Sequence, residues 1–372
     1  MANFRQHDQI DMITMNSVPK VYILILNYRG CDDTPECLES VLRIDYPNYQ
    51  IILVDNASPD DSIEKIRLWA AGEPKLWPQK SQMPPFKSSP IIKPIPLLEY
   101  DRAVAESGGG AENGQISAVA CSFNRPIILI HSGGNLGFAG GNNIALRYAL
   151  KKNDFKYVWL LNNDTVVEPS SLTAMVARLN AHPAAGICGS TQLYYDQPEL
   201  IQARGGAIYN RWFATSRHIG VFESAANDFD LNKIERKMAY VCGSSMLVSK
   251  AFLDEVGLMS EDYFLYYEEL DWVTRARGKF AMVYAPESII YHKEGLSIGS
   301  SSHGVKRKKM ADFYGQRNRI IFTRKFFPWA LPLVYLSFLP VIMNRIIRKQ
   351  WDRVPMMLKI LLHPNRRYDE ND

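Results

Sequence analysis

The first half of the chain alternates between short, continuous apolar runs and stretches with helical spacing. Runs of this length are typical of strands buried on both faces, and they cover 20–26, 49–54, 127–130 and 157–161. Helices are expected at about 34–43, 61–70, 140–152 and 170–181, the first with Thr34 as N-cap and Pro35 at the first helical position. This alternation predicts right-handed βαβ units and therefore an α/β fold with a mostly parallel sheet.

Two stretches of the first half lack such a pattern. Residues 1–18 show no apolar periodicity and are predicted to be a mobile tail. Residues 72–126 are rich in proline and contain three successive glycines at 108–110, so they are too long and irregular for an ordinary connection. We interpret this segment as an insertion, to which the sequence assigns no role.

The second half of the α/β domain, which we expect to cover 19–302, has shorter elements. Residues 203–247 are expected to be rich in β-structure around Gly205, Gly206 and Gly220. A helix with three carboxylates in its first turns follows, and a further strand ends near His292.

Residues 303–372 differ from the rest and are predicted to be a basic, membrane-associating helical region. Within it, 326–344 carries no charge and would span about 28 Å as a helix, barely the ~30 Å core of a bilayer. Three prolines interrupt this run, at Pro328, Pro332 and Pro340. Two aromatic residues in it, Trp329 and Tyr335, suit a membrane interface. We favour an interfacial or re-entrant anchor over a true span and over a helix buried against protein.

The net charge of +4 conceals an uneven distribution. Residues 303–372 hold 15 Lys or Arg and 5 Asp or Glu, whereas residues 1–302 hold 28 and 34. This predicts an acidic body and a basic tail that faces an anionic surface. The tail lacks the pattern of a helix-turn-helix or an RNA-binding module, which favours a membrane over nucleic acid.

Composition excludes several classes of protein. A chain of 372 residues with 47% hydrophobic and 22% charged positions is not disordered, collagen-like or a coiled coil. Its five cysteines are odd in number, widely spaced and without a CxxC pair, so neither a disulfide framework nor a cysteine zinc site is expected. These features favour a reducing, cytoplasmic compartment, and no signal peptide pattern is present at the N-terminus.

Small polar residues end each of the four predicted strands, at Asn27-Tyr28, Asp55-Asn56, Gly134-Asn135 and Asn162-Asn163-Asp164. In open parallel sheets, ligands bind outside the carboxyl ends of the strands, so these residues predict one polar crevice suited to ribose hydroxyls and base N–H groups. The alternative for each is ordinary turn chemistry. Neither a GxGxxG sequence after the first strand nor a GxxxxGK[ST] loop is present, which disfavours hydride transfer and P-loop hydrolysis.

Two sets of residues suggest reaction chemistry. Asn162 and Asp164 can share one hard cation, and His292 would complete a mixed nitrogen and oxygen site for Mg²⁺ or Mn²⁺. The three helical carboxylates Glu268, Glu269 and Asp271 can supply a general base, although acidic first turns are also routine in helices.

Together these residues resemble the inverting glycosyltransferases of family 2, which have the GT-A fold, and most of all their rhamnosyltransferase-like branch. The likeness covers about 20–325 apart from the insertion. The matching stretches are 21–28, 52–58, 135–143, 160–166, 243–248, 264–271 with Arg275, His292, and 314–318.

The resemblance implies a role for each candidate residue. Those expected to bind the nucleotide sugar are Asn27, Tyr28, Asp55, Asn56, Asn135, Gly137, Phe138, Asn142, Asn143, Asn162 and Asn163. Metal ligands would be Asp164, His292 and Asn162, with Asn162 in place of the first acid of the family's DxD motif. Glu268 and Glu269 match the family's acidic pair, whose second member is the catalytic base and is usually Asp. Glu269 is therefore assigned as the base, with Asp271 as the runner-up.

The reaction implied by the resemblance is a single displacement that inverts the anomeric carbon of a nucleotide sugar. The candidate donors are dTDP-rhamnose and a UDP-sugar. The acceptor would be a saccharide or lipid-linked saccharide in cell-surface polysaccharide synthesis, at the cytoplasmic face of the plasma membrane. Two alternatives stay open: a non-catalytic nucleotide-sugar-binding subunit of an assembly complex, and a scaffold held at the membrane by its tail.

Overall fold

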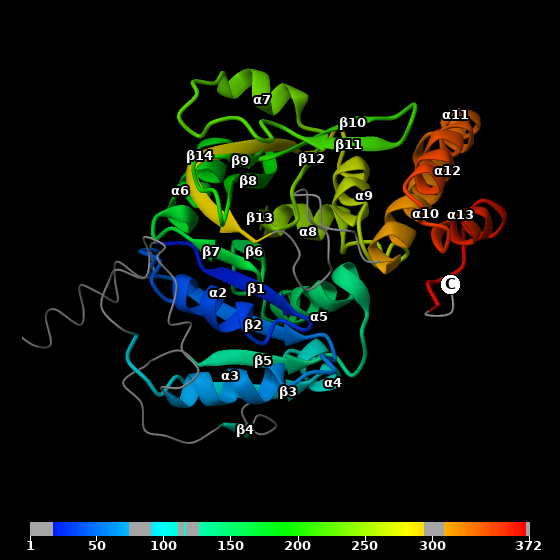
Figure 1. Cartoon of the computed structure of the whole chain (residues 1–372). Coiled ribbons are helices and arrows are strands. Elements are labelled where there is room, and N and C mark those ends of the chain that lie inside the picture. Colours follow the sequence, from blue (N-terminus) through cyan, green and yellow to red (C-terminus); the bar gives the residue numbers. More distant parts are fainter. Residues whose placement is uncertain (1–17, 74–90, 111–114, 117–125, 294–308, 370–372) are drawn as a thin grey trace, which may run out of the picture.

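The computed structural model describes residues 18–73, 91–110, 115–116, 126–293 and 309–369. The predicted mobile tail lies outside these residues, apart from Val18. The described chain forms an α/β body, a small second sheet and a group of C-terminal helices (Figure 1).

One mixed sheet crosses the body. Its strands in spatial order are β4 (Gln115–Ile116), β3 (Leu97–Asp101), β5 (Ile127–His131), β2 (Tyr49–Asp55), β1 (Val21–Asn27), β6 (Tyr157–Asn162), β13 (Ser245–Ser249), β8 (Ala185–Tyr194), β14 (Ala281–His292) and β7 (Thr165–Val167), with β9 (Ile201–Arg204) beside β8. The five strands from β3 to β6 run parallel, whereas β13 is antiparallel to both of its neighbours. The predicted α/β fold with a mostly parallel sheet is confirmed.

The helices that connect these strands include the four predicted from spacing. The helices of the body are α2 (Asp33–Val41), α3 (Ser62–Ala71), α4 (Arg102–Glu106), α5 (Gly137–Lys152), α6 (Ser171–Ala181), α7 (Leu231–Lys237), α8 (Lys250–Val256) and α9 (Glu268–Arg275). Thr34 was wrongly expected as the N-cap of the first helix. It lies inside α2, and its hydroxyl donates to Asn27 Oδ1 at 2.7 Å instead.

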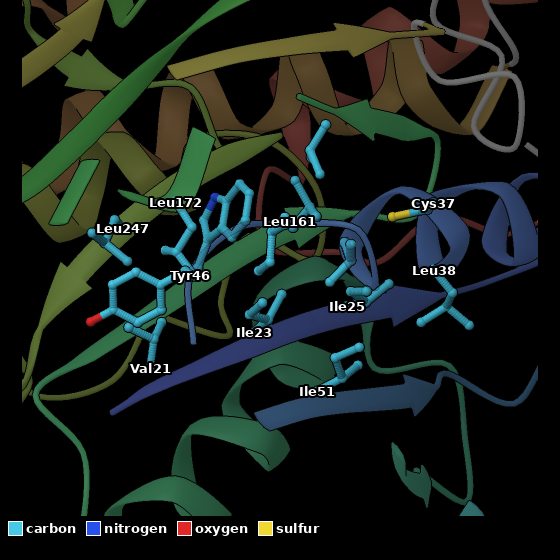
Figure 2. Close-up of a cluster of buried hydrophobic side chains, with 14 of the residues drawn as sticks. Val21, Ile23, Ile25, Cys37, Leu38, Tyr46, Ile51, Leu161, Leu172 and Leu247 are labelled. Atoms are coloured by element: carbon cyan, nitrogen blue, oxygen red, sulfur yellow. The ribbon is translucent and has the colours of Figure 1, made fainter. Parts of the chain in front are cut away.

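Strand β1 is buried because its side chains enter two hydrophobic cores. Val21, Ile23 and Ile25 lie in the cluster formed with α2, α3 and α6 (Figure 2). Tyr22 and Leu24 point to the opposite face and join the cluster formed with α5, α8 and α9. Burial of each such side chain contributes about 1.5–3 kcal/mol, which explains why the strand has a continuous apolar run rather than an alternating one.

Part of the predicted insertion belongs to the sheet. Residues 97–101 form β3, which pairs in parallel with β5, and Ile95 and Leu97 are buried in the first core. Arg67 of α3 donates two hydrogen bonds to Glu99 of β3, at 2.9 and 2.8 Å, and so fastens the strand to the body. The segment therefore adds strand β3 to the sheet. The prolines that precede this strand made it look irregular in the sequence.

The region predicted to be rich in β-structure forms a second, three-stranded sheet. Strand β10 (Gly206–Asn210) pairs with β11 (Thr215–His218) and β12 (Tyr240–Val241), all antiparallel. The sequence did not predict α7, which interrupts this region.

Four helices and a 3-10 turn end the described chain: α10 (Lys309–Phe326), η3 (Pro328–Ala330), α11 (Leu331–Leu336), α12 (Phe338–Ile347) and α13 (Arg353–Leu362). Figure 1 shows them together on one side of the molecule, beyond α9. Pro332 and Pro340 lie in the first turns of α11 and α12, where a missing N–H is tolerated. Residues 328–347 are long and apolar enough to cross a membrane by length and composition.

Candidate active site

The carboxyl ends of β1, β2 and β6 bring the predicted polar residues together. The register places Asn27 beside Asp55, and Leu26 beside Asn162. Asn27 Nδ2 donates to Asp55 Oδ1 at 2.7 Å, and Asn163 Nδ2 donates to Asn27 Oδ1 at 3.3 Å. These amides and the carboxylate are buried, so they hold the three strand ends in one fixed arrangement.

A second wall comes from the loop between β5 and α5. Asn56 Nδ2 donates to Asn135 Oδ1 and to the Gly137 carbonyl, both at 3.1 Å. Gly137 has φ 72°, and a Cβ there would lie 2.2 Å from the Phe264 carbonyl oxygen. The Phe138 N–H donates to that same oxygen at 2.7 Å, so only glycine at 137 permits this close approach.

The predicted metal ligands meet, although they are far apart in the sequence. His292 Nε2 lies 3.2 Å from Asp164 Oδ1. The other ring nitrogen, Nδ1, lies 2.7 Å from Gln202 Oε1, so Gln202 accepts the Nδ1 proton and orients the ring with Nε2 toward Asp164. Within the described residues, no three His, Cys, Asp or Glu side chains are grouped as a metal site, so further ligands would be amides or substrate oxygens.

Two adjacent glutamates begin α9 in a desolvated setting. Burial, with the nearby charge of Glu269, raises the pKa of Glu268 well above its usual range. Its Oε2 has no hydrogen-bond partner in the part of the chain that the structure describes, so a neutral carboxyl is favoured. Burial also raises the pKa of Glu269 to about 7, against the effect of hydrogen bonds from the backbone of Glu269 and Gly243.

Gly243 makes room for Glu269. A Cβ at this position would lie 2.1 Å from Glu269 Oε1. The next residue, Ser244, accepts a hydrogen bond from the Asn162 N–H at 3.0 Å. Backbone contacts thus connect the Glu269 carboxylate to the strand end that carries Asp164.

Asp271 is differently placed. It is fully buried, and it accepts hydrogen bonds from Arg275 Nε at 2.8 Å, Lys325 Nζ at 2.6 Å and Tyr263 Oη at 2.9 Å. Both of its oxygens are therefore occupied in joining α9 to α10. This arrangement suits a structural ion pair better than a base that must reach substrate.

The loop before α9 has an unusual backbone that a single side chain stabilises. Phe264, Tyr266 and Tyr267 all have positive φ, at 65°, 68° and 77°. From α10, Asn318 Nδ2 lies within 2.8–2.9 Å of the carbonyl oxygens of Tyr263, Leu265 and Tyr266. Left-handed backbone costs free energy for residues with a Cβ, so these contacts hold a conformation that the loop alone would not keep.

These walls line a cavity of about 70 Å³ that opens to solvent. Its lining residues are Leu26, Tyr28, Asn56, Asn135, Gly137, Phe138, Asn162, Asn163, Asp164, Phe264, Leu265 and Met310. The mixture of amide, carboxylate and aromatic groups in this lining suits a polar ligand with a planar ring.

Comparison with known proteins identifies the family. The model of glycosyl transferase family 2 matches residues 22–77 and 114–257, together more than half of the chain. The chain belongs to this family. The unmatched segment 78–113 falls within the predicted insertion, and the match ends before Glu269, His292 and α10.

Individual relatives of this family 2 protein are distant. The hexosyltransferase Agl10 of low-salt glycan biosynthesis from Haloferax volcanii is 27% identical over 161 residues, covering 42% of this chain and 48% of that protein. The N-acetylglucosaminyl-diphospho-decaprenol L-rhamnosyltransferase of Mycobacterium tuberculosis is 24% identical over 188 residues, covering 46% and 60%. A mannosyltransferase from Pyrobaculum calidifontis, solved with GDP-Man and Mn²⁺, aligns with TM-score 0.48 at 13% identity, covering 94% and 86%.

The cavity of this family 2 protein is lined by seven of the eleven nucleotide-sugar candidates and by Asp164, whereas His292, Glu268, Glu269 and Asp271 do not line it. Four of the nucleotide-sugar candidates do not line it: Asn27, Asp55, Asn142 and Asn143. Asn142 donates to the Phe138 carbonyl within α5, and Asn143 donates to the Met259 carbonyl, so both brace the cavity wall from behind.

Sequence reasoning missed several residues of the site. Leu265 and Met310 line the cavity, and Gln202 and Asn318 orient groups beside it. Asn318 lies in the stretch 314–318 that carried part of the family likeness, which was a usable signal. Gln202 lies in a short strand without any motif, and no pattern pointed to it.

Replacement of Asn318 tests whether the loop conformation depends on its amide. Asn318→Asp keeps the shape but removes the donors, and we expect it to lower the free energy of unfolding by about 2 kcal/mol or more because three buried carbonyls lose their partner. We also expect a lower kcat with little change in donor KM and an altered pH profile, since Glu269 follows this loop. Chemical denaturation and steady-state kinetics measure these effects.

The matched control is Asn232→Ala, which changes an exposed helical asparagine of α7. Wild-type stability and kinetics in Asn318→Asp would show that the amide does not position the loop.

Proposed function

We propose that this family 2 protein is an inverting glycosyltransferase that uses a nucleotide-sugar donor. The observation that carries the proposal is the His292–Asp164 contact of 3.2 Å, in which Asp164 lines the cavity. Glu269 lies against Gly243, whose neighbour Ser244 accepts a hydrogen bond from the cavity residue Asn162. A site for an anionic leaving group and a carboxylate with a raised pKa are the two parts that a direct displacement requires.

The residues present fit a divalent cation such as Mg²⁺ or Mn²⁺. A carboxylate oxygen of Asp164 and a ring nitrogen of His292 face each other, and Gln202 orients the ring by accepting the proton of the other nitrogen. When bound there, the cation would neutralise part of the charge on a departing diphosphate. Asn162, in place of a second carboxylate, lines the same cavity and offers an amide oxygen.

Glu269 is proposed as the general base. Its raised pKa places its carboxylate near half ionisation at neutral pH, where a base is both available and strong. Glu268, held neutral by burial, adds no second negative charge beside it. The family's usual Asp is shorter by one methylene, and the space beside Gly243 accommodates the longer Glu269 side chain.

The proposed displacement balances in one step. Glu269 accepts the proton of an acceptor hydroxyl as that oxygen forms a bond to the anomeric carbon from the side opposite the nucleotide. The bond between the anomeric carbon and the phosphate oxygen breaks, and the nucleoside diphosphate leaves with the electron pair toward Asp164 and His292. One displacement inverts the configuration of the sugar.

The acceptor is proposed to be a saccharide carried on a lipid, in cell-surface polysaccharide synthesis at the cytoplasmic membrane face. The mycobacterial relative is an N-acetylglucosaminyl-diphospho-decaprenol L-rhamnosyltransferase, and the decaprenol in its name supports a lipid carrier. dTDP-rhamnose is the donor we place first, because the motif likeness to the rhamnosyltransferase branch agrees with the name of this relative.

A donor screen tests this function. The purified chain with Mn²⁺ is heated with UDP, dTDP or GDP, and the nucleotide of the true donor is expected to raise the melting temperature, because a ligand that binds the native state stabilises it. Release of that nucleoside diphosphate from its sugar conjugate then measures turnover. Binding without any turnover, with lipid-linked acceptors supplied, would favour the alternative of a non-catalytic nucleotide-sugar-binding subunit.

A further inference from the structure

We propose that the outer faces of α11, α12 and α13, together with the turn between β10 and β11, form one surface that docks onto an anionic lipid bilayer without crossing it. The proposed partner of this surface is the bilayer, and not a second protein.

An exposed apolar stripe runs along α11 and α12. Leu336, Leu339, Met343 and Ile347 recur every three or four residues, so they share one face of the helix. Leu339 is 65% exposed and Ile347 is 72% exposed. Beyond α12 the exposed apolar side chains continue with Trp351, Leu358 and Leu362. A set of large exposed apolar residues this extensive marks an interaction surface.

The opposite faces of the same helices are already occupied. Val334 and Phe338 pack with Met356, Met357 and Ile360 of α13, in one cluster that also holds residues of α10. The helices therefore have one face committed to the protein and one that faces away from it, which is the pattern of an interfacial helix.

The second sheet contributes to this surface. Trp212, in the turn between β10 and β11, lies 4.5 Å from Trp329 between ring centroids. Arg319 of α10 fixes this turn by donating to the Phe213 carbonyl at 2.8 Å. Trp212, Phe213 and Trp329 are each about half exposed, and such rings are favoured at the level of lipid headgroups.

The exposed charged residues near the apolar stripe indicate an anionic bilayer. Exposed Arg348, Lys349 and Lys359 accompany the apolar stripe, with Asp352 as the exposed acidic residue between them. Cations beside an apolar face attract anionic headgroups, so the complementary partner is a negatively charged membrane surface.

Ion pairs hold these helices in the docked form and oppose a spanning one. Asp312 of α10 is fully buried and accepts from Arg345 and Arg353, both at 2.7 Å. If 328–347 crossed the bilayer, Arg345 would leave Asp312, and the inner face of α12 would lose its contacts. Breaking a buried ion pair leaves an uncompensated charge, so the span is disfavoured despite sufficient length.

The docked surface lies close to the cavity. Phe138, Phe264, Leu265 and Met310 belong both to the cavity wall and to the cluster beneath α11–α13. Docking would thus place part of the cavity wall in the same packed cluster as the helices that contact the lipid. The statement that a lipid-linked acceptor reaches the cavity from there rests on the proposed function, whereas docking itself does not.

The test measures flotation of the full chain with phosphatidylglycerol-containing vesicles and with neutral phosphatidylcholine vesicles. We expect wild type to bind strongly to the anionic vesicles and not to the neutral ones. The double variant Leu339→Glu with Ile347→Glu should bind the anionic vesicles at least about tenfold more weakly. The matched control is Ile92→Glu, the same kind of change at a residue 68% exposed in the irregular stretch before β3, and it should bind like wild type. Because no donor, metal or acceptor is present, the result is independent of the proposed function.

Three results would overturn the proposal. One is equal flotation of the double variant and wild type, with circular dichroism showing both folded. A second is wild-type protein that resists alkaline extraction from the vesicles, which indicates a span. The third is a wild-type dimer in analytical ultracentrifugation that the double variant abolishes, without vesicle binding by either, which assigns this surface to a second copy of the chain.

Discussion

Glu269→Gln is expected to lower kcat by about 10²–10⁴-fold, while nucleotide affinity stays within about twofold of wild type. The amide keeps the size of the side chain beside Gly243 but cannot accept the acceptor's proton. Donor binding depends on residues elsewhere in the cavity, so the loss should appear in kcat and not in the dissociation constant. Stopped assays of nucleoside diphosphate release, with calorimetric titration of the nucleotide, separate the two quantities.

The pH dependence has a defined sign. Because burial raises the pKa of Glu269 to about 7, the ionised base becomes more abundant as pH rises, and wild-type activity should climb through pH 7 to a plateau. Stability should change in the opposite direction. Between pH 4.5 and 7 the folded state binds more protons than the unfolded state, so the free energy of unfolding falls as pH rises. In Glu269→Gln this fall should be less steep, with Glu268 still contributing.

Glu199→Gln is the control, since Glu199 is exposed and has no place in the cavity. If Glu269→Gln retained wild-type kcat, another group would be the base. Asp271 would be the next to examine by the same substitution, although its contacts with Arg275 and Lys325 make a fall in stability the expected result.

Asp164→Asn is expected to weaken Mn²⁺ binding and to lower kcat by about 10²-fold or more, because the leaving group loses the charge that the cation supplies. The substitution keeps the shape of a residue that is 3% exposed, so the fold should persist. Calorimetric titration of Mn²⁺ in the presence of the nucleoside diphosphate measures affinity, and chelation with EDTA should abolish wild-type turnover reversibly.

The comparison variant is Asp196→Asn, which removes an exposed carboxylate elsewhere. His292→Ala should give the same loss of Mn²⁺ affinity, since His292 is the other member of the pair. Turnover that survives both Asp164→Asn and EDTA would refute the metal assignment while leaving the base assignment to be judged on Glu269→Gln.

Particular residues show how far sequence reasoning reached. Asn162 and Asp164 were recognisable because they end a buried apolar run, and parallel strands end at one edge of a sheet. Strand β3 was missed because prolines precede it, and only its pairing with β5 identifies it. Asp271 resembled Glu269 in the sequence. Only the positions of Lys325, Tyr263 and Gly243 separate a carboxylate held in an ion pair from one that lies against a glycine backbone.

The sequence by itself determined the parallel α/β body, the polar strand ends and the family, because these depend on short-range periodicity and local motifs. Tertiary structure alone decided which residues meet: Gln202 with His292, Asn318 with the loop before α9, and Asp312 with Arg345. It also decided which face of the apolar C-terminal run is exposed. These outcomes depend on contacts between segments that are far apart in the sequence. The local sequence pattern does not predict which distant residue a side chain will contact in the folded protein.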